Sequence, residues 1–476
     1  MQQIIIDSLI NHDFQKAEKL SIELMKKNPV NAQAWLFLAE ALAFQGYGET
    51  AEKVLQRALL LDPQAVWIDQ AQNDLKQADK GKKRKDIEDL LVVKNLSVTA
   101  AIIVKDEEHH ISNCLKNLVP AVDEILIVDT GCTDNTIIIA KTFPKVKVIE
   151  FAWCDDFSAA RNSALPHIQT DWVIWIDADE YLYEEDMQNI KITAAIYDSV
   201  NVPVLIRIGQ MNMTNDNQLI GNFDMNRMFS LKYPYKFHSR IHEQLIMEGA
   251  DIYNRKGFSN PARIRVLHDG YTSSEMKQKD KLNRNIQLLK IMVEEEPGNP
   301  AWLFFYGRDL CTSGKTEEGI ASLLQCEESA QEYPNFGRLL DVHSILVNAY
   351  LSKMDLDSAE EVCLRSMEIR KDFPDILYAY SRIKLERSIQ LLKEAEKYVV
   401  NSLTSFESYR SLVSPDEAIR NWKGDLLYSD IALCQGKIAK AVESYNKALK
   451  SSPANVKNSI TNKLNMINSE IKTILK

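Results

Sequence analysis

The chain has 476 residues, a length that allows roughly two to four domains with hydrophobic cores of their own. Its 57 Lys and Arg residues against 67 Asp and Glu residues give a net charge of −10. This balance argues against general nucleic-acid binding, because phosphate recognition needs a surplus of basic side chains. A signal-peptide pattern, an apolar run of about 20 residues and a CxxC pair are all missing, and the seven cysteines are scattered. We therefore expect a reduced, cytoplasmic protein without a membrane span.

A repeated pattern lies near each end of the chain. The segment that ends at Pro63 aligns with the segment that ends at Pro453, so that Gly46 matches Gly436. A glycine after the first helix, small alanines between the helices and a closing proline resemble the tetratricopeptide repeat. Such a helix pair cannot bury its apolar face alone and must stack on a neighbour. We expect N-terminal repeats over residues 1–80.

A charged segment, residues 81–96, follows these repeats. It begins in the basic run KGKKRK, which is read as a solvated linker, with a nucleic-acid or membrane patch as the alternative. The linker is expected to separate the front repeats from the rest of the chain, so that the next domain does not depend on them for stability.

Residues 97–275 have the rhythm of an α/β domain with a mainly parallel sheet, because apolar runs alternate with amphipathic stretches. The expected strands are 97–105, 123–131, 146–151, 172–178 and 202–209. The expected helices lie near 107–119, 134–143 and 156–166. Residues 276–476 are expected to form a C-terminal region of tetratricopeptide-like helical repeats, with one loose copy around Trp302 and Gly314.

Acidic side chains follow three of the expected strands. Asp106 follows the first, Asp129 ends the second, and Asp177 and Asp179 end the fourth. In an open α/β sheet, ligands bind beyond the carboxyl ends of the strands, so these side chains should converge there. Asp106 and Asp129 are therefore candidates for cofactor binding, although Asp129 also suits an ordinary strand-to-helix turn.

The fourth strand places two carboxylates, Asp177 and Asp179, directly after the apolar run WVIWI. Like charges this close need a neutralising partner. Alternate strand residues point to one side, and two hard oxygen ligands suit Mg²⁺ or Mn²⁺. Solvated acids are the alternative, because an Asp-x-Asp sequence by itself is common.

Other polar residues are candidates for the same site. Arg161, in FSAARNSAL, is placed either to bind a diphosphate or to brace the acidic edge through an ion pair. His242 is a candidate metal ligand, with a structural histidine as the alternative, and Glu243 is a candidate general base. His268, in VLHDGY, is the rival metal ligand.

Taken in order, DTGCTD (129–134), ARN (160–162) and DAD (177–179) resemble family 2 glycosyltransferases of the GT-A fold. The motifs FHSRIHEQL and VLHDGY further resemble the sublancin-type peptide S-glycosyltransferases of bacteria, which modify peptides or proteins. The resemblance implies a UDP-sugar donor, a divalent metal and an inverting transfer. It assigns Asp129 to the uridine base, Asp177 to the ribose or the metal, and Asp179 to the metal. Thr130 departs from the family's DDGS motif, and the QxxRW motif of processive synthases is absent.

The leading hypothesis is a metal-dependent, inverting glycosyltransferase that moves a hexose from a UDP-sugar to a Cys, Ser or Thr side chain of a peptide or protein, with Mn²⁺ or Mg²⁺ as cofactor. Asp179 and Glu243 are its expected catalytic residues. One rival is a tetratricopeptide scaffold with a silent transferase-like domain, and another is a transferase acting on glycan or lipid acceptors. No nucleic-acid partner is expected, and homodimer formation is left open.

Overall fold

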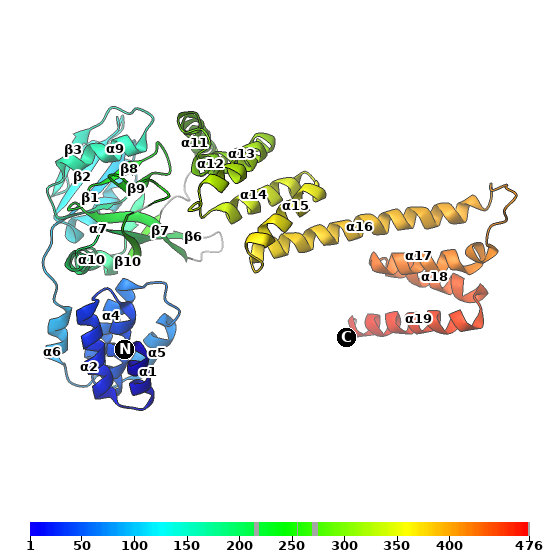
Figure 1. The fold of residues 1–476 in the computed structure, drawn as a ribbon, viewed down its shortest axis with the longest axis horizontal. Helices are drawn as coiled ribbons and strands as arrows, with labels where there is room; N and C mark the ends of the chain where they lie inside the picture. Colours follow the sequence, from blue (N-terminus) through cyan, green and yellow to red (C-terminus); the bar gives the residue numbers. More distant parts are fainter. Residues whose placement is uncertain (214–218, 255, 269–274, 475–476) are drawn as a thin grey trace. The chain divides into compact units, whose positions relative to one another are not determined.

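The computed structural model describes residues 1–213, 219–254, 256–268 and 275–474 (Figure 1). The chain divides into two compact units, residues 1–336 and 337–476. The first unit contains the front helices, an α/β domain and the helices that directly follow it. The second unit is helical wherever it has regular structure.

An eight-stranded sheet forms the centre of the first unit, in the order β3-β2-β1-β4-β7-β6-β10-β5. The strands of the parallel half are β3 (Val146–Glu150), β2 (Glu124–Asp129), β1 (Val98–Val104) and β4 (Trp172–Trp175). The other half contains β7 (Leu219–Ser230), β6 (Val204–Met213), β10 (Phe258–His268) and β5 (Glu180–Leu182). There β10 is parallel to β6, whereas β7 and β5 run antiparallel to their neighbours.

Both faces of the sheet are covered, which explains why its first strands are so apolar. Side chains alternate between the faces, so Ala100 and Ile102 enter one hydrophobic cluster and Ala101 enters another. The first face carries α7 (Ile111–Ala121) and α10 (Met187–Val200). The second carries α9 (Phe157–Ala164) and a separate hairpin of β8 (Tyr235–His238) and β9 (Gln244–Met247). Figure 1 shows these two layers on opposite sides of the strands.

The five strands expected from the sequence are confirmed as β1, β2, β3, β4 and β6. The expectation of a mainly parallel sheet holds for β3-β2-β1-β4 but not for the other half, which is mixed. The strands that sequence reasoning missed carry polar or charged residues that interrupt the apolar signal. In β10, for example, Pro261 accompanies a shift in register, and Arg263 and Arg265 alternate with buried residues.

The front repeats form helix pairs, as expected. The helices are α1 (Gln2–Ile10), α2 (Phe14–Lys27), α3 (Ala32–Phe44), α4 (Gly48–Leu61) and α5 (Ile68–Gln77). Gly46 turns the chain between α3 and α4 with φ 81°, and Gly436 has φ 71° between α17 (Gly424–Cys434) and α18 (Ile438–Ser451). This backbone conformation favours glycine and explains why the two copies share it.

The charged segment after the repeats is exposed to solvent over residues 80–83, as expected, but it is not a free linker beyond them. Arg84 pairs with Glu18 of α2, with Nη2 2.7 Å from Oε1, and Ile87 in the short helix α6 (Lys85–Glu88) is fully buried. The guanidinium of Arg57 in α4 donates to the carbonyl oxygen of Leu91 at 2.9 Å. The segment is therefore fastened to the repeats through Arg84, Ile87 and Leu91.

The front repeats also pack against the α/β domain, contrary to the expected independence of that domain. Helix α4 lies against β10, and the guanidinium of Arg263 donates to Gln56 at 3.1 Å. One hydrophobic cluster includes both Leu59 of α4 and Val266 of β10. The two parts therefore share a core.

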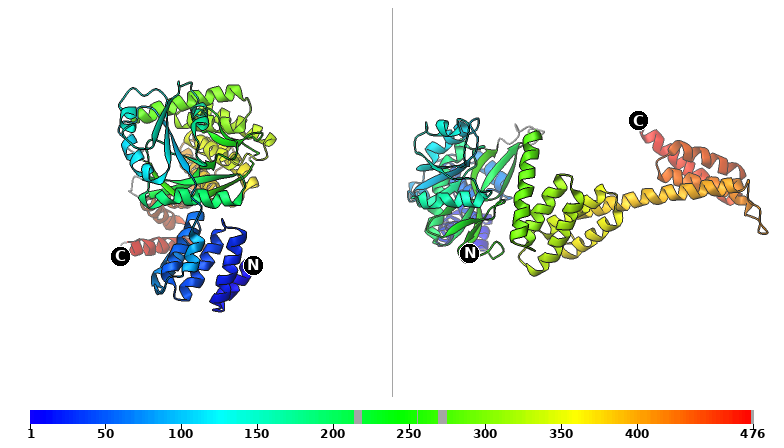
Figure 2. Two further views of the ribbon diagram at one scale, coloured as in Figure 1. Left: turned by 90° about the vertical axis from the view of Figure 1, so that its left-hand side faces the viewer. Right: turned by 90° about the horizontal axis from the view of Figure 1, so that it is seen from above.

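The remaining helices follow the sheet. In the first unit these are α8 (Thr136–Ala140), α11 (Glu275–Glu295), α12 (Pro300–Thr312) and α13 (Thr316–Ser329). The second unit contains α14 (Leu339–Ser352), α15 (Leu356–Ile369), α16 (Pro374–Ser405), α17, α18 and α19 (Ala454–Ile474). Figure 2 shows α16 as one long continuous helix. Within the described residues, no helix is long and apolar enough to cross a membrane.

Candidate active site

The acidic residues expected at the strand ends lie where the strand order reverses. From β1 the sheet continues to β2 on one side and to β4 on the other, so β1 and β4 flank a switch point. Asp106 follows β1, Asp129 ends β2 and Asp177 follows β4. The carboxyl ends of these parallel strands therefore place the three acids along one edge, the position at which α/β sheets bind ligands.

Asp129 organises the loop that follows β2. Its Oδ1 accepts hydrogen bonds from the backbone N–H of Gly131 at 3.0 Å and of Cys132 at 2.8 Å, and Gly131 has φ 100°. One oxygen thus acts as a turn cap, which was the alternative to a ligand role. The assignment of Asp129 to the uridine base stays a prediction.

Asp106 joins the loop after β1 to the loop after β2. Its Oδ1 accepts from the backbone N–H of Thr133 at 2.6 Å and from the Thr133 hydroxyl at 3.1 Å. The N–H of Thr133 holds the pKa of Asp106 below its ordinary value. Asp106 also has φ 54°, a conformation uncommon for a residue other than glycine. Its role in cofactor binding stays a prediction.

In the part of the chain that the structure describes, one group of three possible metal-ligand atoms lies within 4.8 Å of one another: Asp106, Cys132 and Asp134. Sequence reasoning did not single it out, although Cys132 stands in the DTGCTD motif. Burial raises the pKa of the Cys132 thiol to about 11, which opposes the thiolate form that binds metals. The carboxylate of Asp134 also accepts hydrogen bonds from the N–H and the hydroxyl of Thr136 and from the N–H of Glu108.

Asp177 is held by two arginines. Its Oδ1 accepts from Arg161 Nη2 at 3.1 Å and from Arg227 Nη1 at 2.9 Å, and its Oδ2 accepts from Arg227 Nη2 at 2.5 Å. Burial opposes ionisation, but the charges of Arg227 and Arg161 hold the pKa of Asp177 well below its usual range. The guanidinium groups thus neutralise this acid, and its roles toward ribose or metal stay predictions.

Arg161 connects Asp177 to the candidate base. Its Nε donates to Glu243 Oε1 at 3.0 Å, and its guanidinium lies 4.9 Å from the ring centre of Trp175. Arg161 is buried, and its Nη1 has no hydrogen-bond partner. This geometry fits the ion pair that was the alternative to diphosphate binding, and it leaves one buried donor unused. The next residue, Asn162, pairs with the backbone of Phe237 in both directions and fixes α9 to β8.

Arg227 and Glu180 complete the network, and sequence reasoning assigned neither of them to the site, although Glu180 directly follows Asp179. Glu180 is fully buried, accepts from the N–H of Asp177 and from Gln210 at 2.9 Å, and lies 3.5 Å from Arg227 Nη2. Burial raises the pKa of Glu180, although Arg227 opposes this shift. Burial would lower the pKa of Arg227, but Asp177 and Glu180 raise it. The only signal for Arg227 was one basic residue in NFDMNRMFS, a strand that the pattern did not reveal.

Asp179 meets His268 at the junction of β5 and β10. The imidazole Nε2 lies 3.3 Å from Asp179 Oδ2, and the imidazole Nδ1 lies 3.2 Å from Asn212 Oδ1. The hydrogen bond that the His268 imidazole donates to Asp179 raises the pKa of His268 against the effect of burial. Burial would raise the pKa of Asp179, but His268 lowers it. The end of the VLHDGY motif, residues 269–271, lies outside the described residues.

His242 lies against helix α12. Its ring stacks on Phe305 with ring centres 4.2 Å apart, and its Nε2 is 3.2 Å from Arg308 Nη2. His242 also has φ 55°. The structure therefore brings His268 into contact with Asp179, whereas His242, in the loop between β8 and β9, packs against α12. A metal role for either histidine stays a prediction.

Residues 99–248 match the model of "Glycosyl transferase family 2". Residues 8–77 and 426–455 each match a "Tetratricopeptide repeat" model. The first match covers the strands and loops that carry Asp106, Asp129 and Asp177.

Among curated proteins, the chain is similar to the SPbeta prophage-derived glycosyltransferase SunS of Bacillus subtilis, with 29% identity over 339 residues, 69% of this chain and 78% of SunS. An uncharacterized glycosyltransferase of Rickettsia typhi is 34% identical over 101 residues, which cover 21% of this chain and 34% of that protein. Among solved structures, S. aureus TarS 1-349 has a TM-score of 0.33 and 13% identity, covering 59% of this chain and 93% of TarS 1-349.

Proposed function

Because the chain is a family 2 glycosyltransferase with tetratricopeptide repeats, we propose that it moves a hexose from a UDP-sugar to a Cys, Ser or Thr side chain of a peptide or protein. The observation that carries the proposal is the network at the switch point of the sheet. There Arg161 joins an acid at a strand end, Asp177, to an acid from another loop, Glu243. The similarity to SunS supports a glycosyltransferase, and the flanking repeats are candidates for holding an extended acceptor.

A divalent ion fits Asp179 and His268 better than it fits Asp177. Asp179 Oδ2 and His268 Nε2 are 3.3 Å apart, a separation that suits two neighbouring ligands of one ion at about 2.1 Å each. Both oxygens of Asp177 instead accept hydrogen bonds from arginines. A bound Mn²⁺ or Mg²⁺ would supply positive charge that stabilises the diphosphate leaving group.

In this proposal Glu243 accepts the proton of the attacking acceptor group on a carboxylate oxygen. Attack from the face opposite the leaving group inverts the configuration at the sugar carbon. Arg161 fixes the orientation of Glu243 through its Nε, while Asp177 fixes Arg161 from the other side. The unused Nη1 of Arg161 is a buried donor for an oxygen of the substrate. The buried network thus provides an oriented base and donors that need no large rearrangement during the reaction.

The proposal is tested by incubating the full chain with UDP-sugars and Mn²⁺ and measuring UDP release. We expect Glu243→Gln and Asp179→Asn each to reduce turnover roughly 10²-fold or more. The control Glu248→Gln, in the turn after β9, should retain activity. Undiminished turnover in excess EDTA would contradict the metal assignment, and no UDP release with any UDP-sugar would contradict the donor class.

A further inference from the structure

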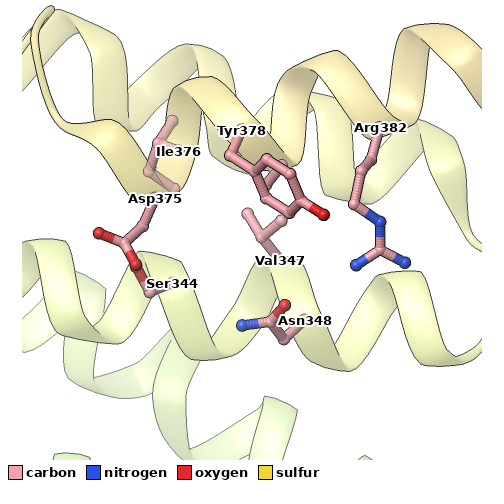
Figure 3. A pocket seen from close by; sticks show the side chains of 8 residues that line it. Ser344, Val347, Asn348, Asp375, Ile376, Tyr378 and Arg382 are labelled. Carbon is pink, nitrogen blue, oxygen red and sulfur yellow. The ribbon is translucent and has the colours of Figure 1, made fainter.

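The second unit contains a pocket between α14 and α16 that the proposed chemistry does not use (Figure 3). Ser344, Val347 and Asn348 line it from α14, and Asp375, Ile376, Tyr378 and Arg382 line it from α16. In Figure 3 the side chains of Tyr378 and Arg382 extend from α16 toward α14. The pocket has a volume of ≈ 110 Å³, well below the roughly 300–1,000 Å³ of pockets that enclose whole cofactors or drug-sized ligands. Its size suits part of a larger molecule.

Polar side chains around this pocket lack partners. Within the described residues, no hydrogen bond or ion pair joins the side chains of Ser344, Asn348, Asp375, Tyr378 or Arg382 to another residue. The hydroxyl oxygen of Ser344 is buried from solvent and is also unpaired. Buried polar atoms normally have a partner, so this hydroxyl is an unsatisfied polar group in the wall of the pocket.

The spacing of the charges defines the chemistry of a ligand. Asp375 and Arg382 are seven residues apart on one face of α16, which corresponds to about 10.5 Å along the helix. Tyr378 lies between them on the same face and is 69% exposed. A peptide in the polyproline II conformation places residues i and i+3 on one side, about 9.3 Å apart, and such peptides dock on exposed aromatic rings.

We propose that this pocket binds a segment of the acceptor polypeptide in the polyproline II conformation. The segment carries a basic and an acidic side chain at positions i and i+3. The basic side chain pairs with Asp375, the acidic one pairs with Arg382, and the two middle residues pack on Tyr378. The identification of the occupant as the acceptor rests on the proposed function, in which the acceptor is a peptide or protein.

The face of α16 beyond the pocket extends the same surface. Leu385 and Ile389 follow Tyr378 at seven and eleven residues, so they continue its face, and they are 60% and 37% exposed. Apolar residues next to the charged pair would pack there. A ligand of this kind therefore has a charged anchor and an apolar continuation.

The first test measures direct binding of labelled peptides to the full chain by fluorescence anisotropy. The probes contain Lys-Pro-Pro-Glu, Lys-Pro-Pro-Lys or Glu-Pro-Pro-Glu between short Gly-Ser flanks. The wild type should bind the mixed-charge peptide roughly tenfold more tightly than either like-charged peptide. Arg382→Glu leaves two acids and should prefer Lys-Pro-Pro-Lys, whereas Asp375→Lys should prefer Glu-Pro-Pro-Glu. Equal binding of the three peptides, or preferences that the variants do not change, would overturn the proposal.

The matched control is Arg410→Glu with Glu417→Lys, two exposed charges in the segment after α16, which should keep the wild-type preference. The second test compares glycosyl transfer to peptides that contain Cys, Ser and Thr, with and without Lys-Pro-Pro-Glu. The motif should lower KM about tenfold in the wild type but not in Arg382→Glu, with kcat unchanged. Selective binding without an effect on KM would overturn the acceptor assignment. An absence of transfer to any peptide, with selective binding intact, would count against the proposed function alone.

Discussion

Removing Arg227 should destabilise the first unit far more than removing a surface arginine. Arg227 and Glu180 are buried, and Asp177 is 37% exposed. Arg227→Met would leave both carboxylates without this guanidinium while keeping most of the side-chain volume. Breaking a buried ion pair costs about 3–5 kcal/mol, and the exposure of Asp177 favours the lower end, about 3 kcal/mol. The control Arg240→Met breaks an exposed pair with Glu295 and should cost less than about 1 kcal/mol.

The pH dependence of this loss distinguishes a charge effect from a packing effect. The pKa of Asp177 in the folded protein lies below its ordinary value of 3.8, so its ion pairs stabilise the fold above that pH and lose this contribution as the pH falls. The difference between wild type and Arg227→Met should therefore be full at pH 7 and should shrink below about pH 4. Urea unfolding of the full chain, followed by circular dichroism at both pH values, measures it. The electrostatic explanation would be refuted if Arg227→Met lowered the free energy of unfolding by no more than Arg240→Met does, or if its effect became larger in acid.

Burial, together with Asp74, raises the pKa of Glu40 from 4.5 to about 7, so the free energy of unfolding should fall as the pH rises between these values. Glu40→Gln should therefore stabilise the folded protein above pH 7 by up to roughly 3 kcal/mol, which thermal melting can measure. Unchanged melting of Glu40→Gln at pH 8 would contradict this. Deleting residues 1–80 should lower the melting temperature of the α/β domain, because α4 shares a core with β10; an unchanged temperature would restore the view that the front repeats are independent. Arg161→Lys should lower kcat for UDP release more than it raises KM, because lysine lacks the forked geometry that joins Asp177 to Glu243; an effect on KM alone would assign Arg161 to donor binding.

The sequence predicted the parts of the fold in which a local pattern decides the structure. Apolar runs identified β1, β2, β4 and their order along the chain, and the glycine spacing identified the repeats. It did not reveal β7 and β10, because polar and charged residues within these strands break the apolar pattern. The packing of α4 on β10 joins residues about two hundred positions apart, and a local pattern carries no information on such pairs.

For the candidate site, too, the sequence predicted the residues that stand in local motifs but not the partners that tertiary contacts bring to them. Residues in motifs, such as Asp129 and Asp177, lie at the strand ends as anticipated. The neutralising partners of Asp177 depend on tertiary contact. Arg227 belongs to a strand that was not recognised, and its ion pair neutralises Asp177 from that strand.

The shared core of α4 and β10 determines where the chain can be divided for engineering. A chimera that exchanges the front repeats at residue 96 would replace one side of a packed interface and leave Val266 against an unmatched surface. The boundary between Phe336 and Gly337 separates two compact units instead. Recombination experiments should therefore exchange residues 337–476 as one block and keep residues 1–336 intact.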